Sequence, residues 1–364
     1  MHSLNKPQNL TLALMGKAGD AVLWLLALLH VTALAILLMT LLSLGEAEAA
    51  PQETSCGGAD ILVTMQKNDP QRYQAIEQEA AAIPNGKGTF WRIEKSGAEP
   101  SYLLGTMHVT DPRVLEMPNG AKAAFEKAGA VIVESDEIVD DQKVAVSLLS
   151  KPELTMFLDG KSITDILSPE NAARLEKGLK DRGIPLNAVS RMKPWMLSGF
   201  VALPACEFTR KAAGASFLDK KLAEDALKNG KRLIGLETMV EQLTAMSELP
   251  MEFHLQSLIE TLELGDRMDD VMATMTDLYV SGDIGMTMPM LKSLDTKTAG
   301  TSEQGYAAFE QRIITDRNHV MAERAAPELE KGNVFMAVGA LHLPGSEGVI
   351  ELLRAQGFRV TRVE

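Results

Sequence analysis

The alternation of apolar and polar positions along the 364-residue chain predicts short strands that are interspersed with helices. Residues 89–93 and 101–104 are expected to form a pair of strands, joined by a turn at 97–100. The apolar runs at 130–134 and 232–236 are short enough to be buried strands. Strands that alternate with helices are typical of α/β proteins, and we expect that fold class here.

Two segments of the chain repeat one order of elements: a strand, a Gly-x-x-His motif, a loop, a helix, a glycine and a second strand. The first motif ends at His108 and the second at His342. Each copy has the composition of a βαβ unit, so we expect a mixed, largely parallel sheet built from two Gly-x-x-His βαβ units. Groups at the carboxyl ends of strands face the crevice where ligands bind. Two copies could therefore bring both imidazoles to one crevice.

Between the two copies, about residues 150–330, we expect a large helical insertion within a single domain of residues 50–364. Apolar residues at helical spacing predict helices at 168–183, 218–229, 251–280 and 303–331. Pro327 is expected to interrupt the last of these, because proline removes a backbone donor from a helix interior.

The N-terminal region contains the longest apolar stretch of the chain, at residues 21–44. Two lysines precede it and two glutamates follow it, a bias that places the N-terminus in the cytoplasm and the rest of the chain outside. Residues 1–49 are therefore expected to be a signal peptide or an N-terminal membrane anchor, and the Ala-Glu-Ala sequence at 47–49 leaves both open. Either alternative predicts a periplasmic or other extracytoplasmic location, with membrane contact only through this segment.

The chain has two cysteines, Cys56 and Cys206. In an oxidising compartment they are expected to form a disulfide, the alternative being two unrelated buried thiols. The net charge of −13 argues against a nucleic-acid partner, because such binding depends on neutralising phosphates with lysine and arginine. The composition, 46% hydrophobic and 23% charged, is that of an ordinary globular protein.

The repeated histidines are the main candidates for chemistry. His108 and His342 occupy equivalent places in the repeat, and neutral imidazole is a common ligand of divalent metals. Gly105 and Gly339 would let the backbone turn sharply or approach a ligand closely. Glu134 ends an apolar run, where it could complete a His-His-carboxylate metal set, act as a general base, or remain a solvated strand-end charge.

Two further charged residues are candidates for the same site. Glu237 ends a second apolar run in the same manner as Glu134. Arg317 lies on a late helix, where its guanidinium could hold a carboxylate or carbonyl of a substrate or form a structural ion pair.

The chain resembles the TraB/PrgY/GumN family, which includes the Tiki proteases, and is most similar to its bacterial GumN branch. The resemblance covers roughly residues 57–364 and is carried by Ser101–His108, Val133-Glu134, Gly235–Thr238, Gln242-Leu243, Arg317-Asn318 and Val338–Gly345. It implies a fold similar to the ChaN and erythromycin esterase-like proteins. It also implies a metal-dependent protease that uses His108, His342 and Glu134.

The expected function is therefore a metal-dependent hydrolase, more specifically a peptidase, with Mn²⁺, Co²⁺ or Zn²⁺ as cofactor. Its partner would be a peptide or protein substrate, and Glu134, Glu237 and Arg317 would take part in catalysis. The alternative is a non-catalytic binding module that sequesters a peptide, a metal or a haem-like ligand in the same crevice.

Overall fold

The computed structural model describes residues 56–294 and 303–363. The expected signal peptide or anchor at 1–49, with its apolar stretch at 21–44, lies outside the described residues. Within the described ranges, none of the helices has both the length and the apolar character needed to cross a bilayer.

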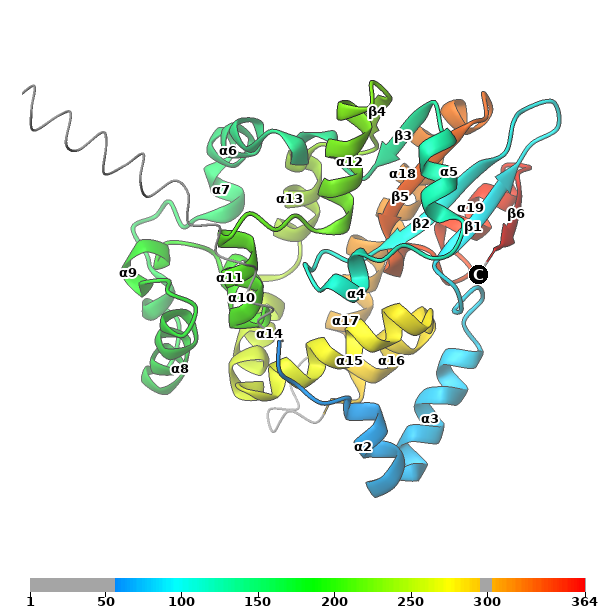
Figure 1. Cartoon of the computed structure of the whole chain (residues 1–364). Helices are drawn as coiled ribbons and strands as arrows, with labels where there is room; N and C mark the ends of the chain where they lie inside the picture. The colour runs from blue at the N-terminus through cyan, green and yellow to red at the C-terminus, as the bar shows by residue number, and fades with distance from the viewer. Residues whose placement is uncertain (1–55, 295–302, 364) are drawn as a thin grey trace, which may run out of the picture. The chain divides into compact units, whose positions relative to one another are not determined.

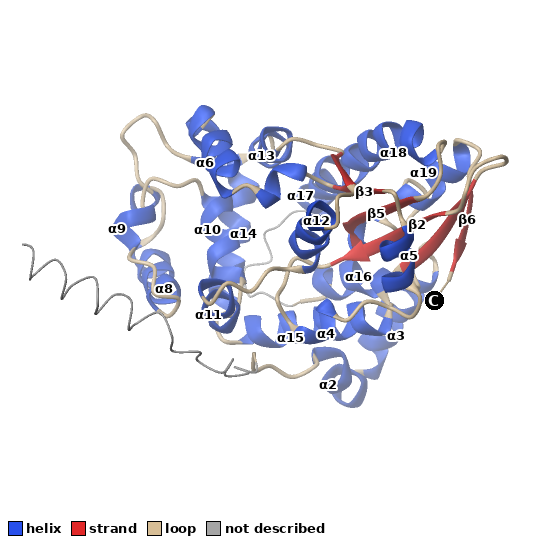
Figure 2. Cartoon of the chain, turned by 45° about the horizontal axis from the view of Figure 1, so that its top comes forward, coloured by secondary structure: helices blue, strands red, loops and turns tan. Residues whose placement is uncertain are grey.

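A six-stranded mixed sheet lies to one side of the helical part (Figure 2). Its strand order is β4-β3-β5-β2-β1-β6. The strands are β1 (Phe90–Glu94), β2 (Ser101–Thr106), β3 (Ala130–Val133), β4 (Arg232–Gly235), β5 (Val334–Gly339) and β6 (Arg359–Arg362). Neighbours are parallel from β4 to β2, whereas β1 is antiparallel to both β2 and β6. The expected mixed, largely parallel α/β sheet is confirmed.

The two repeated segments are interleaved in this sheet. Strand β5 of the second copy lies between β2 and β3 of the first, and β6 pairs only with β1. Neither copy therefore pairs its own two strands with each other. As a result, the strands that precede the two Gly-x-x-His motifs are direct neighbours, with Thr106 opposite Gly339.

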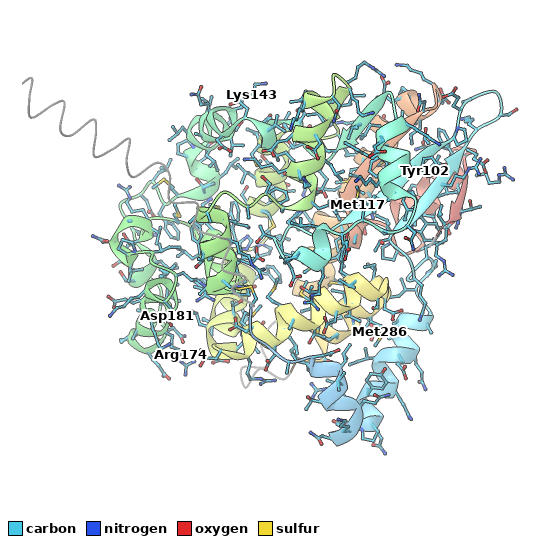
Figure 3. All side chains as sticks on the ribbon, in the orientation of Figure 1. Tyr102, Met117, Lys143, Arg174, Asp181 and Met286 are labelled. Atoms are coloured by element: carbon cyan, nitrogen blue, oxygen red, sulfur yellow. A yellow bond between two sulfur atoms is a disulfide. The ribbon has the colours of Figure 1, made fainter. Side chains whose placement is uncertain are left out.

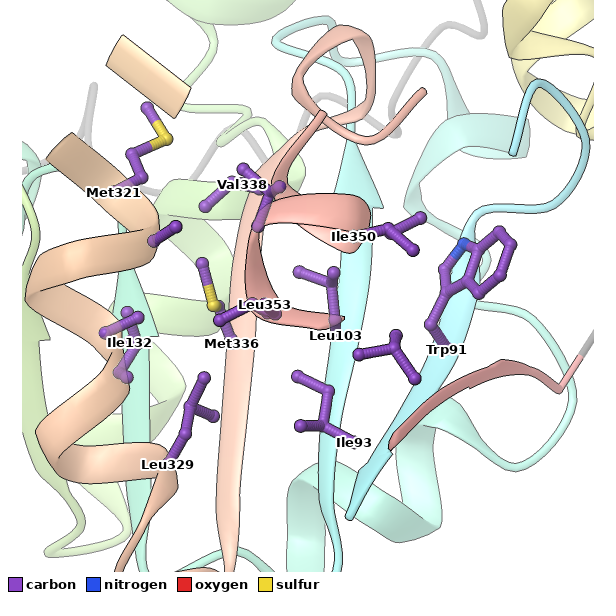
Figure 4. Close-up of a cluster of buried hydrophobic side chains, with 14 of the residues drawn as sticks. Trp91, Ile93, Leu103, Ile132, Met321, Leu329, Met336, Val338, Ile350 and Leu353 are labelled. Atoms are coloured by element: carbon purple, nitrogen blue, oxygen red, sulfur yellow. The ribbon is translucent and has the colours of Figure 1, made fainter. Parts of the chain in front are cut away.

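The sheet is buried on both faces because successive side chains of a strand point to opposite sides. Along β5, Val334, Met336 and Val338 face one core and Phe335 and Ala337 face the other. Helices α18 (Asp316–Leu329) and α19 (Val349–Ala355) cover the first face, where Figure 4 shows their side chains packed against the strands. Helices α5 (Ala121–Lys127) and α12 (Leu218–Lys228) cover the second.

Between β3 and β5 the chain is mainly helical, and β4 is the only sheet strand in this described part (Figure 1). The helices of this part not yet given are α6 (Asp141–Ser150), α7 (Pro152–Thr155), α8 (Pro169–Lys180), α9 (Leu186–Val189), α10 (Pro194–Ala202), α11 (Ala205–Ala212), α13 (Met239–Ser247), α14 (Met251–Leu264), α15 (Arg267–Ser281), α16 (Thr287–Lys292) and α17 (Glu303–Phe309). Helices α8, α10 and α14 share a separate apolar core. Lys143 on α6 is exposed, and its side chain points away from the helical part in Figure 3.

The remaining helices precede or follow the first strands: α2 (Ile61–Asn68), α3 (Pro70–Ala81) and α4 (Pro112–Leu115). The expected helices at 168–183 and 218–229 are confirmed as α8 and α12, and the Ser168 side chain caps α8. The expected interruption near Pro327 is wrong, because α18 continues through this proline. The irregular part of that stretch is a π-helix at Glu310–Thr315.

Cys56 and Cys206 form the expected disulfide, with their Cα atoms 5.4 Å apart. The bond joins the first described residue to α11 across a sequence separation of 150. It therefore fixes the start of the described chain against the helical part of the structure.

Candidate functional site

The two Gly-x-x-His motifs leave the sheet side by side. His108 follows β2, and His342 ends a 3₁₀ turn, Ala340–His342, that follows β5. The neighbouring backbones come so close that a Cβ on Gly105 would lie 3.1 Å from the Cα of Ala340. Glycine is required here for close approach rather than for a left-handed backbone, since neither motif glycine has a positive φ.

Glu134 follows β3 directly and reaches both histidines. Its Oε1 lies 4.0 Å from Nε2 of His108 and 3.9 Å from Nε2 of His342. The same oxygen accepts a hydrogen bond of 2.7 Å from the backbone N–H of Gly339. A Cβ on Gly339 would lie 3.0 Å from this carboxylate oxygen. The structure thus brings together the two histidines, the glutamate and the glycine named from the sequence.

The orientation of His108 is fixed by Asp219, in the first turn of α12. Nδ1 of His108 donates to Oδ2 of Asp219 at 3.0 Å, because an ionised carboxylate can only accept. The other oxygen, Oδ1, accepts from the hydroxyl of Thr106 at 2.5 Å. With its proton on Nδ1, a neutral His108 presents the lone pair of Nε2 towards Glu134.

Asn318 on α18 gives His342 the same orientation. The amide nitrogen of Asn318 donates to the backbone carbonyl of Glu347 at 2.9 Å, which turns its Oδ1 towards the imidazole. Nδ1 of His342 donates to that oxygen at 2.7 Å. Both histidines therefore have an occupied Nδ1 and direct Nε2 towards one carboxylate oxygen, the arrangement found where imidazoles bind a metal.

Arg317 is held between two buried glutamates. Its Nε donates to both carboxylate oxygens of Glu237, at 3.2 and 3.0 Å, and its Nη2 donates to Glu134 Oε2 and Glu237 Oε2, each at 2.7 Å. Gln242 adds a 3.3 Å hydrogen bond to Glu134 Oε2. These contacts are those of the ion-pair alternative for Arg317, and a contact of its guanidinium with a substrate stays a prediction.

The surroundings shift the pKa values of His108, His342 and Glu134 away from their ordinary values, and not all in the same direction. The charge of Asp219 raises the pKa of the half-exposed His108 to about 9. Burial lowers the pKa of His342 to about 4. Burial also opposes the ionisation of Glu134, but the neighbouring positive charges and the Gly339 N–H outweigh it and lower its pKa to about 2. At neutral pH His342 is therefore neutral and Glu134 is ionised.

The order of these elements corresponds to a known family. The model of the TraB/PrgY/gumN family matches residues 89–362, which include both Gly-x-x-His motifs and Glu134. This chain belongs to the TraB/PrgY/gumN family.

Several TraB/PrgY/gumN relatives carry the name metalloprotease. Metalloprotease TIKI1 of Danio rerio is 27% identical over 314 residues, covering 74% of this chain and 62% of the relative. Metalloprotease TIKI2 of Xenopus tropicalis is 28% identical, with 74% of this chain and 58% of the relative covered. The chain thus spans about three fifths of the length of these relatives. The uncharacterized protein YbaP of Shigella flexneri is 22% identical, with 72% and 90% covered.

No solved structure matches this member of the TraB/PrgY/gumN family at a significant level. The resemblance to ChaN and erythromycin esterase-like folds therefore stays a prediction, while the mixed α/β architecture is established by the strand pairing.

Two imidazoles and a carboxylate, from His108, His342 and Glu134, are groups that bind divalent cations. In the structure their donor atoms are too far apart to enclose one. Among the described residues, no three His, Cys, Asp or Glu side chains are placed so that they could hold a metal ion as they stand. Ligand atoms at the corners of a tetrahedral site with bonds of about 2.1 Å lie about 3.4 Å apart. The separations of 4.0 and 3.9 Å exceed this by roughly half an ångström, so metal binding would require Glu134 to move closer to the histidines.

Asp219 and Asn318 complete the site, although no sequence pattern predicted a role for either residue. Asp219 is 2% exposed and Asn318 is 1% exposed, and each holds one histidine. An acidic residue in the first turn of a helix is already explained by the helix dipole, so Asp219 carried no distinguishing signal. Asn318 could be found only through its place beside Arg317 in the family pattern.

Proposed function

We propose that this protein is an extracytoplasmic metal-dependent peptidase in which His108, His342 and Glu134 hold one divalent cation. The observation that carries the proposal is the common direction of the two imidazoles. Each Nδ1 is occupied by a buried oxygen acceptor, so both Nε2 atoms are left to bind a cation beside Glu134 Oε1. The metalloprotease names of the relatives support the same chemistry.

The formal charges around the site also favour a divalent ion. Among the described residues, the buried carboxylates of Glu134, Glu237 and Asp219 face one guanidinium, that of Arg317. Once His108 has released its Nε2 proton so that a cation can bind, the formal charge of the cluster is −3 + 1 = −2. A buried uncompensated charge is costly. A cation of charge +2 would neutralise the cluster, and when bound at this point it would supply Lewis acidity towards a scissile carbonyl.

Each residue of the cluster has a defined task in this proposal. Glu134 serves as a ligand, because a carboxyl with a pKa of about 2 is too weak a base to take a proton efficiently near neutral pH. Arg317, Glu237 and Gln242 keep the Glu134 carboxylate turned towards the histidines. Candidate metals are Mn²⁺, Co²⁺ and Zn²⁺, and the substrate class is a peptide or protein.

The disulfide supports the proposed location, because such bonds persist in oxidising compartments outside the cytoplasm. We propose that residues 1–49 direct the chain there as a cleaved signal peptide or as an inner-membrane anchor, and that residues 50–364 form the family domain.

The experiment that tests the function measures metal content and peptide turnover of the full chain after loading with Mn²⁺, Co²⁺ or Zn²⁺. We expect near-stoichiometric metal and metal-dependent cleavage in the wild type, and neither in His108→Ala/His342→Ala. His319→Ala is the matched control, because this histidine is exposed and pairs with Glu347 instead. Cleavage that persists unchanged in the double variant would refute the proposal.

A non-catalytic binding module is the second candidate function. It is favoured because the separations between Glu134 Oε1 and the two Nε2 atoms exceed the spacing of ligands in a tetrahedral metal site by roughly half an ångström. Stoichiometric metal or peptide binding without turnover under any of the three metals would select it. Turnover that disappears with chelator and returns with metal would exclude it.

A further inference from the structure

A pocket of about 350 Å³ opens beside the two histidines, and most of its wall is apolar. His108, Glu134, Arg317 and His342 line one part of it. The rest includes half-buried apolar side chains that face the hollow: Met107, Leu203, Met272, Met275, Phe309 and Ile313. The volume is at the lower end of the range for ligand pockets, about 300–1,000 Å³. It suits one large side chain with its adjoining backbone.

Two helical elements present this wall to the site. Met272, Met275 and Tyr279 follow one face of α15 at helical spacing. The π-helix Glu310–Thr315 contributes Ile313, four residues before Arg317, whose Nη1 donates to the Ile313 carbonyl at 3.4 Å. Single turns of π-helix occur frequently at functional sites. The apolar wall and the guanidinium that orients Glu134 therefore belong to one continuous stretch of chain.

Three polar side chains of the lining are engaged within the protein. The Thr106 hydroxyl donates to Asp219, the Tyr279 hydroxyl donates to the Gly105 carbonyl at 2.9 Å, and Arg317 is paired with two glutamates. Of the charged groups in the lining, His108 and Glu134 are assigned to the cation and Arg317 is paired with two glutamates. A charged side chain placed against the apolar wall would therefore lose its hydration without gaining a free counterion. An apolar side chain would gain from burial there.

We propose that this pocket is the specificity subsite of the enzyme and binds a large apolar side chain, such as Leu, Met or Phe, next to the peptide bond that is cleaved. The inference rests on the proposed peptidase function. Met107, Met272 and Met275 line the pocket with flexible thioether chains that adapt to different shapes. Selectivity therefore follows the apolar area of the side chain rather than one particular shape.

The test uses Gly/Ser-rich peptides that differ only in one central residue: Leu, Met, Phe, Ala, Asp or Lys. With the full chain loaded with Mn²⁺, Co²⁺ or Zn²⁺, kcat/KM for the Leu, Met and Phe peptides is expected to exceed that for Ala roughly 10- to 100-fold. The Asp and Lys peptides are expected to be the poorest. Equal kcat/KM for the Leu, Ala and Asp peptides would overturn the proposal.

Met275→Glu probes the pocket wall without touching the metal ligands. It is expected to reduce kcat/KM for the Leu peptide and to raise it for the Lys peptide, because the new carboxylate supplies the missing counterion. Met275→Leu should keep the wild-type preference. Met251→Glu is the matched control, since Met251 lies 39% exposed at the start of α14 and does not line the pocket. A folded Met275→Glu protein with unchanged preference would also overturn the proposal.

Direct binding separates this inference from the peptidase function. Fluorescence anisotropy of the labelled Leu and Asp peptides, with metal-free wild type and Met275→Glu, reports the subsite without any turnover. If no peptide is cleaved but the wild type prefers the Leu peptide and Met275→Glu does not, the subsite stands and the peptidase function fails. If peptides are cleaved but the wild type binds the Leu and Asp peptides equally, the peptidase function stands and the subsite fails.

Discussion

Asp219 accepts a hydrogen bond from Nδ1 of His108 at 3.0 Å, although 111 positions separate them in the sequence. The contact joins the first turn of α12 to His108, two residues after β2, and determines which ring nitrogen of His108 faces Glu134. It also raises the pKa of His108 to about 9, so a proton competes with any cation for Nε2 at neutral pH.

Replacing Asp219 by Asn should change the pH dependence of metal binding. In the wild type, metal affinity is expected to rise about tenfold per pH unit up to about pH 9, because one proton leaves His108 on binding. In Asp219→Asn the rise should end nearer pH 6.5, and the affinity above pH 9 should fall roughly 10- to 100-fold, since Nε2 becomes less basic. Calorimetric titrations at several pH values measure both effects.

Asp225→Asn is the control for this prediction, because Asp225 lies on the same helix but pairs with Lys221 at the surface. Identical pH profiles for wild type and Asp219→Asn would contradict the assigned role of Asp219.

His342 should make the metal-free protein less stable in mild acid. Burial lowers its folded-state pKa from 6.5 to about 4, so the unfolded state binds more protons between these values. The stability contributed by the neutral, buried His342 is fully present above pH 6.5. It is lost as the pH falls from 6.5 through 4, which lowers the free energy of unfolding by roughly 3 kcal/mol. Urea unfolding of the wild type and His342→Gln from pH 4 to 7 should give a shallower dependence in the variant. Parallel slopes would show that His342 titrates normally.

Much of the fold and of the site could be predicted because the relevant signals are local. The apolar runs indicated the strands, and Glu134 was found because it ends such a run. His108 and His342 were found because they repeat one motif. Each of these inferences needed only a short window of sequence.

The remaining features depend on long-range pairing. The insertion of β5 between β2 and β3 is not encoded in either repeat, although it makes the two motifs neighbours. The engagement of Arg317 by two glutamates depends on the packing of α18 against the sheet. The π-helix at Glu310–Thr315 was not predicted, and the break was expected at Pro327 instead. Hydrophobic spacing alone does not separate a π-helical turn from an α-helix.

Removing the Arg317 guanidinium alone should destabilise the protein more than removing both this guanidinium and the charge of its partner Glu237. Arg317→Met leaves Glu134 and Glu237 buried without their shared guanidinium and should lower the free energy of unfolding by about 3–5 kcal/mol. Arg317→Met/Glu237→Gln should recover part of this loss, because one uncompensated charge is removed. Denaturant unfolding of the metal-free single and double variants measures the coupling. Additive losses would contradict a shared ion-pair network.

Gly339→Ala should disturb the site while the fold persists. The added Cβ would lie 3.0 Å from Glu134 Oε1, closer than most carbon contacts, so the carboxylate must shift. Metal affinity is expected to fall at least about tenfold, since a cation site tolerates displacements of only tenths of an ångström. Gly357→Ala is not a suitable control because of its positive φ, whereas Gly199→Ala is, with open space around its Cβ. Unchanged affinity in Gly339→Ala would remove Glu134 from the proposed ligand set.

Opening the disulfide should weaken the global fold and also loosen the segment after His108. Cys206 precedes Glu207, whose carboxylate accepts hydrogen bonds from the backbone N–H and the hydroxyl of Thr110, each at 2.9 Å. Cys56→Ser/Cys206→Ser is expected to lose about 2–5 kcal/mol of stability, because the bond closes a long loop in the unfolded chain.

Glu207→Gln with the disulfide intact separates the two effects of this bond. It should leave most of the stability in place but weaken metal binding, since Thr110 lies two residues beyond His108 and loses a charged acceptor in a buried position. Thermal unfolding and metal titration of both variants provide the comparison. Full metal affinity in Glu207→Gln, with reduced affinity in the double serine variant, would assign the effect to the loss of global stability rather than to the Glu207–Thr110 contact.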